Sequence, residues 1–581
     1  MSSRLLDREF LDFLLHDWLD IGEVLAQPRF AAHGRETVDA VIDLSEEVAR
    51  DMFLPHFKEG DAEEPRFGPD GVQIHPQVAA ALGEYARLGF FSAGFPEHLG
   101  GLGLPFLAAS ASFAWFAAAN IATSSYAMLT VANARLIASF GSPAQVEAFA
   151  RPQIEGRWFG TMCLSEPQAG SDLGAVRTRA EFHGEDGLGR RYRLTGSKMW
   201  ISGGEHDAAD NIVHLVLAKV AREDGSLPDG TGGLSLFIVP RVLPDGSRNE
   251  IAVAGLNHKM GYRAIPNCLL AFGEQEGAAG WLVGEEGQGL RQMFMMMNEA
   301  RISVGLGAAA IACRGFGHAL GYAQERLQGR MRGSGSTGAV PIIAHADVRR
   351  MLLAQKSYAE GALALCLFAA RLVDEEHDPE SAALLALLTP VVKTFSSEFG
   401  LEANALAMQV HGGYGYTRDF DVEQLYRDNR LNPIHEGTTG IQALDLLGRK
   451  LLRGGEGAAV LTARIAATAR NARWLPELAA MGDALSAAWH AIEAALDVLR
   501  TMPQEQALAR ATPFLHAFGH GVVGWVWLDL AIAARAASPR LQCGTLAACR
   551  YFFDCEIPRI AAWLTPCTAS SDLFAVEADW L

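Results

Sequence analysis

The chain has 581 residues, of which 49% are hydrophobic and 20% charged, so it is long enough for about three to five compact units with sizeable cores. Its net charge of -18 disfavours non-specific binding to nucleic acids, because such binding needs a positive surface. The eight cysteines are scattered without a CxxC pair, which predicts reduced thiols in a cytoplasmic protein and no metal site.

Helical periodicity dominates the first 160 residues. Apolar residues recur every three to four positions between Phe10 and Trp18, which predicts extra helices over 1–35 ahead of a helical domain over 36–160. Residues 1–20 lack the pattern of a signal peptide. Residues 99–134 carry no charge, but their most apolar part, Phe106 to Ala119, has only 14 residues, and a membrane span needs about 20. Pro105 and Asn120 break the pattern on either side of this part, so we predict a buried core helix between them and no membrane span.

From Thr161 the pattern changes to short β-rich runs separated by Gly, Asp and Pro, which predicts a β domain over 161–280. We expect a strand, a turn and a second strand over 192–203, and further strands over 212–220, 234–242 and 267–272.

Helical patterns return over 281–453, with helices predicted over 290–326, 347–373, 379–408 and 422–429. The Gly-rich run 454–457 predicts a boundary. Beyond it, the Ala-rich stretch 454–581 is expected to form a second helical bundle, with helices over 476–501, 504–537 and 541–564. Pro476 is expected in the first turn of its helix, where its missing N–H costs nothing.

Two motifs near the change from helix to β-structure carry groups that suit a ligand. SEPQAGSD, Ser165 to Asp172, offers hydroxyls, a carboxylate and a Gly that admits close backbone approach. KMWISGG, Lys198 to Gly204, offers a Trp and a Ser at a strand end, which could hold a flat heterocycle. Taken singly, each motif is equally compatible with a structural role.

Three further features suit anionic groups. Arg301 and Arg326 lie near the ends of one long helical pattern, and Arg binds phosphate through paired hydrogen bonds, although Arg is also common on surfaces. The loop QVHGGYGY, from Gln409 to Tyr416, is rich in Gly, and its backbone N–H groups could bind phosphate oxygens. It lacks GxGxxG spacing after a strand, so no Rossmann unit is implied.

The turn NPIHEGTTGIQ, from Asn432 to Gln442, places one carboxylate, Glu436, between two helical patterns. A turn that precedes a helix has free backbone N–H groups that suit an anionic ligand. A Glu beside small residues can act there as a general base. A carboxylate that serves the start of a helix is the alternative, and the turn alone favours that alternative.

The order of these motifs, from SEPQAGSD and KMWISGG through Arg301, ERLQGR and QVHGGYGY to HEGTTGIQ, resembles the acyl-CoA dehydrogenase family over roughly residues 30–452. The added helices on either side resemble a longer subgroup that includes methylmercaptopropionyl-CoA dehydrogenase and broad-chain bacterial acyl-CoA dehydrogenases. The resemblance implies a mainly α fold with a central small β-barrel and an extra C-terminal helical bundle. It also implies FAD, an acyl-CoA substrate, an electron-transferring flavoprotein as acceptor, a role in fatty acid β-oxidation, and a homodimer or dimer of dimers.

By residue match, the resemblance implies that Glu436 is the catalytic base. The residues implied to line the flavin are Met162, Leu164, Ser165, Trp200 and Ser202. Those implied to contact the pyrophosphate and adenosine, across the dimer, are Arg326, Gln409, Gly412 and Gly413. Thr438 is implied to contact a flavin phosphate, and Ser171 and Arg301 to lie near the CoA.

The chain departs from the family pattern at three places. His435 stands where many relatives have Tyr, and Gly440 where many have a Gln that contacts phosphate. The segment ERLQGR lacks an aromatic residue that many relatives place against the flavin.

The expected chemistry follows from the weak acidity of a thioester α-proton. The developing enolate needs hydrogen bonds to the thioester oxygen, which the resemblance assigns to the flavin ribityl 2′-hydroxyl and the Glu436 backbone N–H. Burial by the acyl chain should raise the pKa of Glu436 and strengthen the base. The β-hydride is then implied to pass to flavin N5.

Three alternatives stay open at this point. An acyl-CoA oxidase would share these residues and differ in oxygen access. A flavin monooxygenase of the same fold is disfavoured by Glu436, and a DNA-associated flavoprotein of the alkylation-response type is disfavoured by the net charge of -18. The acyl chain length and the role of the C-terminal bundle are left open.

Overall fold

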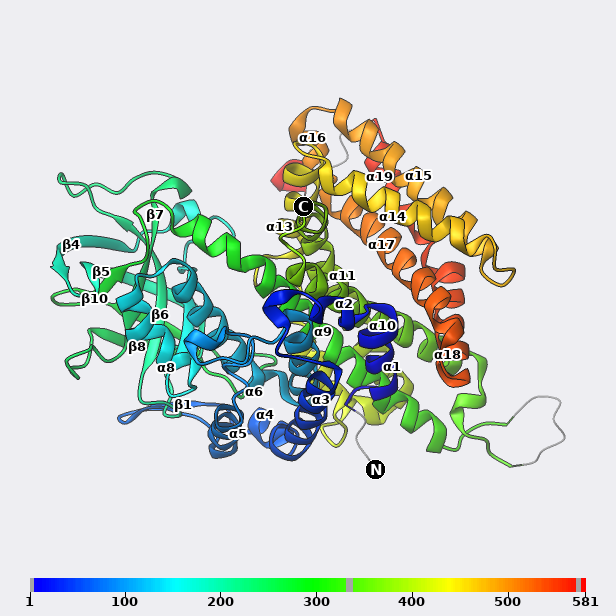
Figure 1. Ribbon diagram of the computed structural model, residues 1–581, viewed down its shortest axis with the longest axis horizontal. Helices are drawn as coiled ribbons and strands as arrows, with labels where there is room; N and C mark the ends of the chain where they lie inside the picture. Colours follow the sequence, from blue (N-terminus) through cyan, green and yellow to red (C-terminus); the bar gives the residue numbers. More distant parts are fainter. Residues whose placement is uncertain (1–4, 331–337, 571–575, 581) are drawn as a thin grey trace. The chain divides into compact units, whose positions relative to one another are not determined.

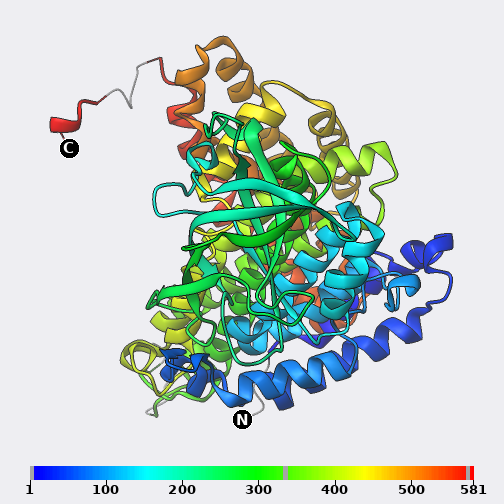
Figure 2. The same cartoon turned by 90° about the vertical axis from the view of Figure 1, so that its left-hand side faces the viewer.

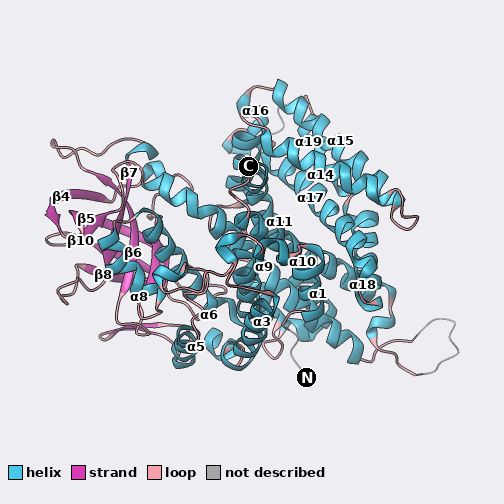
Figure 3. Ribbon diagram, in the orientation of Figure 1, coloured by secondary structure: helices cyan, strands magenta, loops and turns pink. Residues whose placement is uncertain are grey.

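The computed structural model describes residues 5–330, 338–570 and 576–580. The chain divides into two compact units, which we call unit 1 (Met1–Arg35 and Arg301–Leu581) and unit 2 (Glu36–Ala300). All strands described here lie in unit 2, whereas unit 1 is built of helices (Figures 1 and 3).

The first part of unit 2 is helical, and one of its helices is much longer than the others. These helices are α3 (Arg35–Val48), α4 (Phe57–Ala62), α5 (Pro76–Arg87), α6 (Phe106–Phe140), α7 (Pro143–Gln145) and α8 (Arg151–Ile154). The core helix was predicted to end before Asn120, but α6 continues to Phe140, with Asn120 itself out of helical geometry at φ -161° and ψ 92°. A short hairpin of β1 (Arg66–Gly68) and β2 (Gly71–Gln73) lies within residues 60–74, whose Pro, Gly and acidic residues predict a loop.

The β domain of unit 2 closes into a small barrel. Its strands are β3 (Phe159–Cys163), β4 (Arg179–Asp186), β5 (Gly189–Ser202), β6 (Ile212–Val220), β7 (Leu234–Pro240), β8 (Ile251–Leu256), β9 (Asn267–Phe272) and β10 (Ala278–Leu282). The order β10-β7-β6-β4-β5 is a ring because β10 pairs with both β7 and β5, and β5 continues into pairing with β9. Figure 2 shows these strands from a second direction. The predicted barrel is confirmed.

Alternating side chains explain why β6 is buried on both faces. In β6, Val216 and Ala218 belong to one core cluster, whereas Val213, Leu215 and Leu217 belong to another that includes residues of α6. The Asn133 amide of α6 also donates to the carbonyls of Thr161 at 2.9 Å and Val213 at 2.8 Å. The helical part of unit 2 is thus fixed to β3 and β6.

Unit 1 is a set of packed helices. They are α1 (Arg8–Asp12), α2 (Ile21–Leu25), α9 (Gly289–Glu325, within unit 1 from Arg301), α10 (Ala346–Asp374), α11 (Pro379–His411), α12 (Val422–Asn429), α13 (Thr439–Leu444), α14 (Glu456–Ala472), α15 (Ala479–Thr501), α16 (Gln504–Leu508), α17 (Ala511–Ala533), α18 (Pro539–Tyr551) and α19 (Arg559–Thr568). The C-terminal bundle, which follows residue 453, packs onto the helices before it, because α17 contacts α10, α11 and α13. Trp18 donates to Asp529 of α17 at 2.9 Å, so the N-terminal helices also pack here.

Several predicted elements differ from the structure. The expected turn within 192–203 is absent, since β5 is one strand with an irregularity between Lys198 and Ile201. Pro476 precedes its helix, which begins at Ala479. The segments 504–537 and 541–564 are each divided into two helices, and α14 lies in the stretch expected to be helical but was given no bounds. The segment 332–340, whose Gly and Ser residues predict a loop, lies mostly outside the described residues.

Three helical stretches of the described chain, 106–140, 379–416 and 511–536, are long and apolar enough to cross a membrane by length and composition alone. Inside the fold, 83%, 78% and 83% of their most apolar windows are buried. The first of them contains the predicted core helix. These helices therefore place their apolar side chains in the protein's own cores.

Candidate functional site

The turn that carries Glu436 connects α12 to α13 and has an unusual backbone. Glu436 adopts a left-handed φ of 51°, which is rare for a residue with a side chain, and Gly437 follows with φ 86°. Two side chains hold this conformation through its carbonyl oxygens. Lys393 Nζ of α11 donates to the Gly437 carbonyl at 2.8 Å, and Gln442 Nε2 of α13 lies 3.1 Å and 3.3 Å from the carbonyls of Glu436 and Gly437.

The surroundings of Glu436 suit a base. Burial raises the pKa of its carboxyl, and the charges of Lys393 and Arg301 oppose that rise. Among the described residues, neither the Glu436 carboxylate nor its backbone N–H has a hydrogen-bond partner, although its carbonyl accepts from Gln442. The turn thus fixes the backbone of Glu436 and leaves its proton-accepting and N–H groups available.

A ladder of buried amides leads to His435, the residue before the base. The Asn404 amide donates to the Ile311 carbonyl of α9, Asn429 donates to Asn404 at 2.7 Å, and Asn432 donates to Asn429 at 2.8 Å. Asn432 therefore offers its oxygen to His435 Nε2, 3.0 Å away, so that His435 nitrogen is the donor. Burial lowers the pKa of His435 to about 3, so the ring is neutral.

The structure places two other predicted residues close to this turn. Thr438 caps α13, with its hydroxyl accepting from the Ile441 N–H at 3.4 Å. Arg301 is buried and forms an ion pair with Asp445 at 2.7 Å, and Arg449 holds the other oxygen of Asp445 at 2.8 Å. The Arg301 guanidinium predicted near the CoA therefore has a carboxylate partner inside unit 1.

A second group of predicted residues lines a cavity of about 780 Å³ in unit 1. Arg326, Gly412 and Gly413 are among its lining residues, together with aromatic side chains from α9 and the glycine-rich loop. Tyr322 stacks on His411 with ring centroids 4.4 Å apart. Gln409 is not in the lining but exposed on the last turn of α11. A cation, glycine backbone that no side chain covers, and aromatic rings together suit a phosphate joined to a heterocycle.

In unit 2, a buried ion pair joins the two motifs predicted to hold the flavin. Lys198 Nζ lies 2.9 Å from Glu166 Oε1 and 2.9 Å from the Leu164 carbonyl. The Met199 N–H donates to the Ser165 carbonyl at 3.0 Å. Glu166 also accepts from the N–H of Thr178 at 3.0 Å, and the pair lowers its pKa to about 2 against the cost of burial. SEPQAGSD and KMWISGG are thus one structural piece.

The predicted flavin residues of this piece are open to a ligand to different degrees. Trp200 is 59% exposed and has a left-handed φ of 68° at the irregularity in β5. Ser202 is half-buried and accepts from the Asn267 amide at 3.3 Å. Met162, Leu164 and Ser165 are half-buried, and Ser171 is exposed on the loop that follows.

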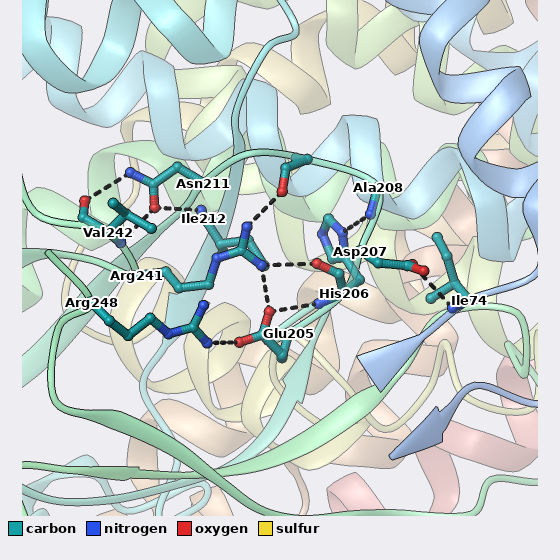
Figure 4. A network of polar contacts seen from close by, with 11 residues as sticks. Ile74, Glu205, His206, Asp207, Ala208, Asn211, Ile212, Arg241, Val242 and Arg248 are labelled. Atoms are coloured by element: carbon teal, nitrogen blue, oxygen red, sulfur yellow. Dashed lines mark hydrogen bonds and ion pairs between the residues drawn. The ribbon is translucent and has the colours of Figure 1, made fainter. Parts of the chain in front are cut away.

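The loop after β5 is anchored by a polar network (Figure 4). Arg241 donates to the Glu205 carboxylate, to the His206 carbonyl at 2.9 Å and to the Ala209 carbonyl at 2.6 Å. Arg248 holds the second Glu205 oxygen at 2.6 Å. The strand end with Trp200 therefore rests on a loop fixed by two guanidinium groups.

Sequence reasoning missed Lys393, Gln442, the amide ladder and the Glu166–Lys198 pair. Glu166 and Lys198 lie inside motifs that had been singled out, but not as partners. Lys393 did carry a signal, since it is the one charged residue between Glu380 and Glu398 in an apolar helical pattern. The amide ladder had none, because single Asn residues are common at turns and caps.

Models of known families match four consecutive parts of the chain. They are the acyl-CoA dehydrogenase N-terminal domain over 35–157, the middle domain over 161–274, the C-terminal domain over 287–452, and an acetyl-CoA dehydrogenase C-terminal-like domain over 461–576.

Curated relatives match over most of their length. The 3-methylmercaptopropionyl-CoA dehydrogenase of Ruegeria pomeroyi is 39% identical over 510 residues, which are 85% of this chain and 84% of that protein. The broad-specificity linear acyl-CoA dehydrogenase FadE5 of Mycobacterium tuberculosis is 34% identical over 573 residues, 92% of each. An acyl-CoA dehydrogenase structure from Bacillus anthracis, complexed with FAD, shares the fold with a TM-score of 0.73 at 19% identity, and the match covers 98% of this chain and 96% of that one.

Proposed function

The chain belongs to the acyl-CoA dehydrogenase family, and on that basis we propose that it oxidises an acyl-CoA thioester to the trans-2-enoyl-CoA with Glu436 as the base. In this reaction the Glu436 carboxylate takes the α-proton. FAD, when bound, accepts the hydride that leaves the β-carbon. One C–H bond is broken at each carbon and a double bond forms between them, so atoms and electrons balance.

The backbone of the Glu436 turn is the observation that carries this proposal. A left-handed Glu is strained, and strain of about 1–3 kcal/mol persists where the surroundings enforce it. Here Lys393 and Gln442 enforce it through the carbonyl oxygens. The N–H of Glu436 has no acceptor among the described residues, so it is a suitable donor to a thioester oxygen that gains negative charge.

The residues present fit FAD. The cavity lined by Arg326, Gly412 and Gly413 offers a cation and backbone groups for phosphate beside aromatic rings for adenine. In unit 2, the exposed indole of Trp200 and the half-buried Ser202 offer a flat face and a hydroxyl for an isoalloxazine ring. We assign the pyrophosphate and adenosine end of FAD to the first set, which would contact it across the proposed dimer, and the flavin end to the second.

The finer features of the proposal extend the family resemblance. An electron-transferring flavoprotein is the proposed acceptor of the electrons, and fatty acid β-oxidation the proposed setting. The proposed assembly is a homodimer or dimer of dimers in the cytoplasm. Anaerobic reduction of bound flavin by a panel of acyl-CoAs, from short to long and including sulfur-containing chains, would define the substrate, because a well-fitting chain reduces the flavin fastest.

The Glu436→Gln variant tests the base. It keeps the size of the side chain and removes its ability to take a proton, so flavin reduction should slow by at least about 10²–10⁴-fold while FAD stays bound. Glu402→Gln is a matched control, since burial also raises the pKa of that carboxyl and it lies on α11 of the same unit. Reduction at the normal rate in Glu436→Gln would refute the assignment.

A further inference from the structure

Lys393 is a buried cation of α11 whose side chain contacts the Glu436 turn. Its side chain is fully buried, and a buried ammonium is costly unless opposite charge compensates it. Its hydrogen bond goes to the neutral Gly437 carbonyl at 2.8 Å, and among the described residues no carboxylate lies within 4.0 Å of its Nζ. Lys198 of unit 2, by contrast, has a carboxylate at 2.9 Å.

The charges that compensate Lys393 act from beyond 4.0 Å. Glu436 and Glu398 both stabilise its ammonium form, while burial and Arg301 oppose it, so its pKa falls to about 8. Glu398 is itself fixed by a hydrogen bond from Thr439, on the same turn as Glu436. The buried lysine therefore faces two carboxylates, one predicted to be the catalytic base.

We propose that Lys393 is a positioning residue that holds the turn through Gly437 and keeps Glu436 ionised before substrate binds. This inference rests on the proposed function of Glu436. A base must be ionised to accept a proton, yet burial favours the protonated carboxyl. The Lys393 cation beside the turn offsets the cost of keeping a buried carboxylate ionised. It does so without bonding to the carboxylate oxygens, which stay available for the α-proton.

The charges decide the direction in which removal of Lys393 changes the pKa of Glu436. The Lys393 cation lowers that pKa, so its removal should raise it. The acid limb of the pH–rate profile, where the rate falls because the base is protonated, should then move to higher pH. The other charged groups that face this site are Arg301 of α9 and Glu398 of α11, and both are kept in the variants below. His435 stays neutral because its pKa is about 3.

The test compares Lys393→Met with Lys393→Arg as FAD-loaded enzymes. The quantity measured is the rate of anaerobic flavin reduction at low acyl-CoA concentration as a function of pH, whose acid limb reports the base of the free enzyme. Lys393→Met should move that limb up by about one pH unit, the lower end of the effect of an opposite charge. Lys393→Arg keeps the charge, so its limb should stay in place even if its maximum rate falls.

Lys450→Met is the matched control. Lys450 is also largely buried with a pKa of about 8, but it faces Asp445 and bonds to the Ala386 carbonyl. Its removal should leave the acid limb in place. An unchanged limb in Lys393→Met, or an equal shift in Lys393→Arg, would overturn the proposal for Lys393. Full activity of Glu436→Gln would instead overturn the proposed base, so the two failures are distinguishable.

Discussion

The buried pair between Glu166 and Lys198 allows a quantitative prediction for the stability of the predicted flavin motifs. Glu166 is almost fully buried, and its pKa falls from 4.5 to about 2. Because one pKa unit corresponds to 1.36 kcal/mol, the ionised Glu166 contributes about 3 kcal/mol to the folded state at neutral pH. Burial lowers the pKa of Lys198, so part of this gain offsets the cost of burying the ammonium.

Glu166→Gln should therefore lower the free energy of opening around β5 by about 3 kcal/mol, as should Lys198→Met, because each leaves one buried group without its partner. The double variant should lose much less than the sum of the two, since no unpaired charge remains.

Hydrogen exchange of peptides from Gly189–Ser202 measures this opening directly, and a loss of 3 kcal/mol accelerates exchange by about 10²-fold. The stabilisation by Glu166 is present above pH 4.5 and is lost as the pH falls towards about 2, so wild type and Glu166→Gln should converge there. Less than a tenfold change in both single variants at neutral pH would refute this reasoning.

Two further predictions concern the helical unit. Gly437→Ala should lose about 1–3 kcal/mol of stability and most activity, because the position has φ 86° and the new Cβ would lie 2.7 Å from Gln442 Nε2. Gly440→Ala, whose Cβ would meet nothing closer than 3.9 Å, is its control in thermal melting and rate measurements, and equal effects of the two would contradict the role of the turn. Arg326→Met should weaken FAD binding to the apoprotein about tenfold or more in a fluorescence titration through loss of a charged hydrogen bond, whereas Arg330→Met, outside the cavity lining, should not.

Local patterns predicted some elements closely and missed others for physical reasons. The bounds of β6 and β9 agree with the prediction because turn residues flank compact apolar runs, and the bounds of α12 agree as well. β4 was missed because its sequence, RAEFHGED, is polar and mostly exposed, so it lacks the alternation of a half-buried strand. The bounds of α14 were missed because the helix begins at Glu456, inside the Gly-rich run 454–457 that marks the boundary.

In the candidate site, too, some features were predictable from the sequence and others were not. Motif order along the chain predicted the family, which the comparisons confirm. The contacts that shape the turn were not predictable, because Lys393 reaches Gly437 across 44 residues of sequence. The left-handed φ of Glu436 was equally hidden, since a non-Gly residue carries no local signal for that conformation.

The contacts that tie the first helices to α17 and α18 set the order in which the protein can fold during synthesis. Trp18 finds its partner in Asp529, and Arg540 forms ion pairs with Asp7 at 2.7 Å and with Glu9 at 2.5 Å. These partners leave the ribosome more than 500 residues after Trp18. Unit 2 is a continuous stretch and can fold while synthesis proceeds, whereas the early segment waits with an unburied apolar face until α17 emerges. During that interval the early segment exposes an apolar surface that is prone to aggregate.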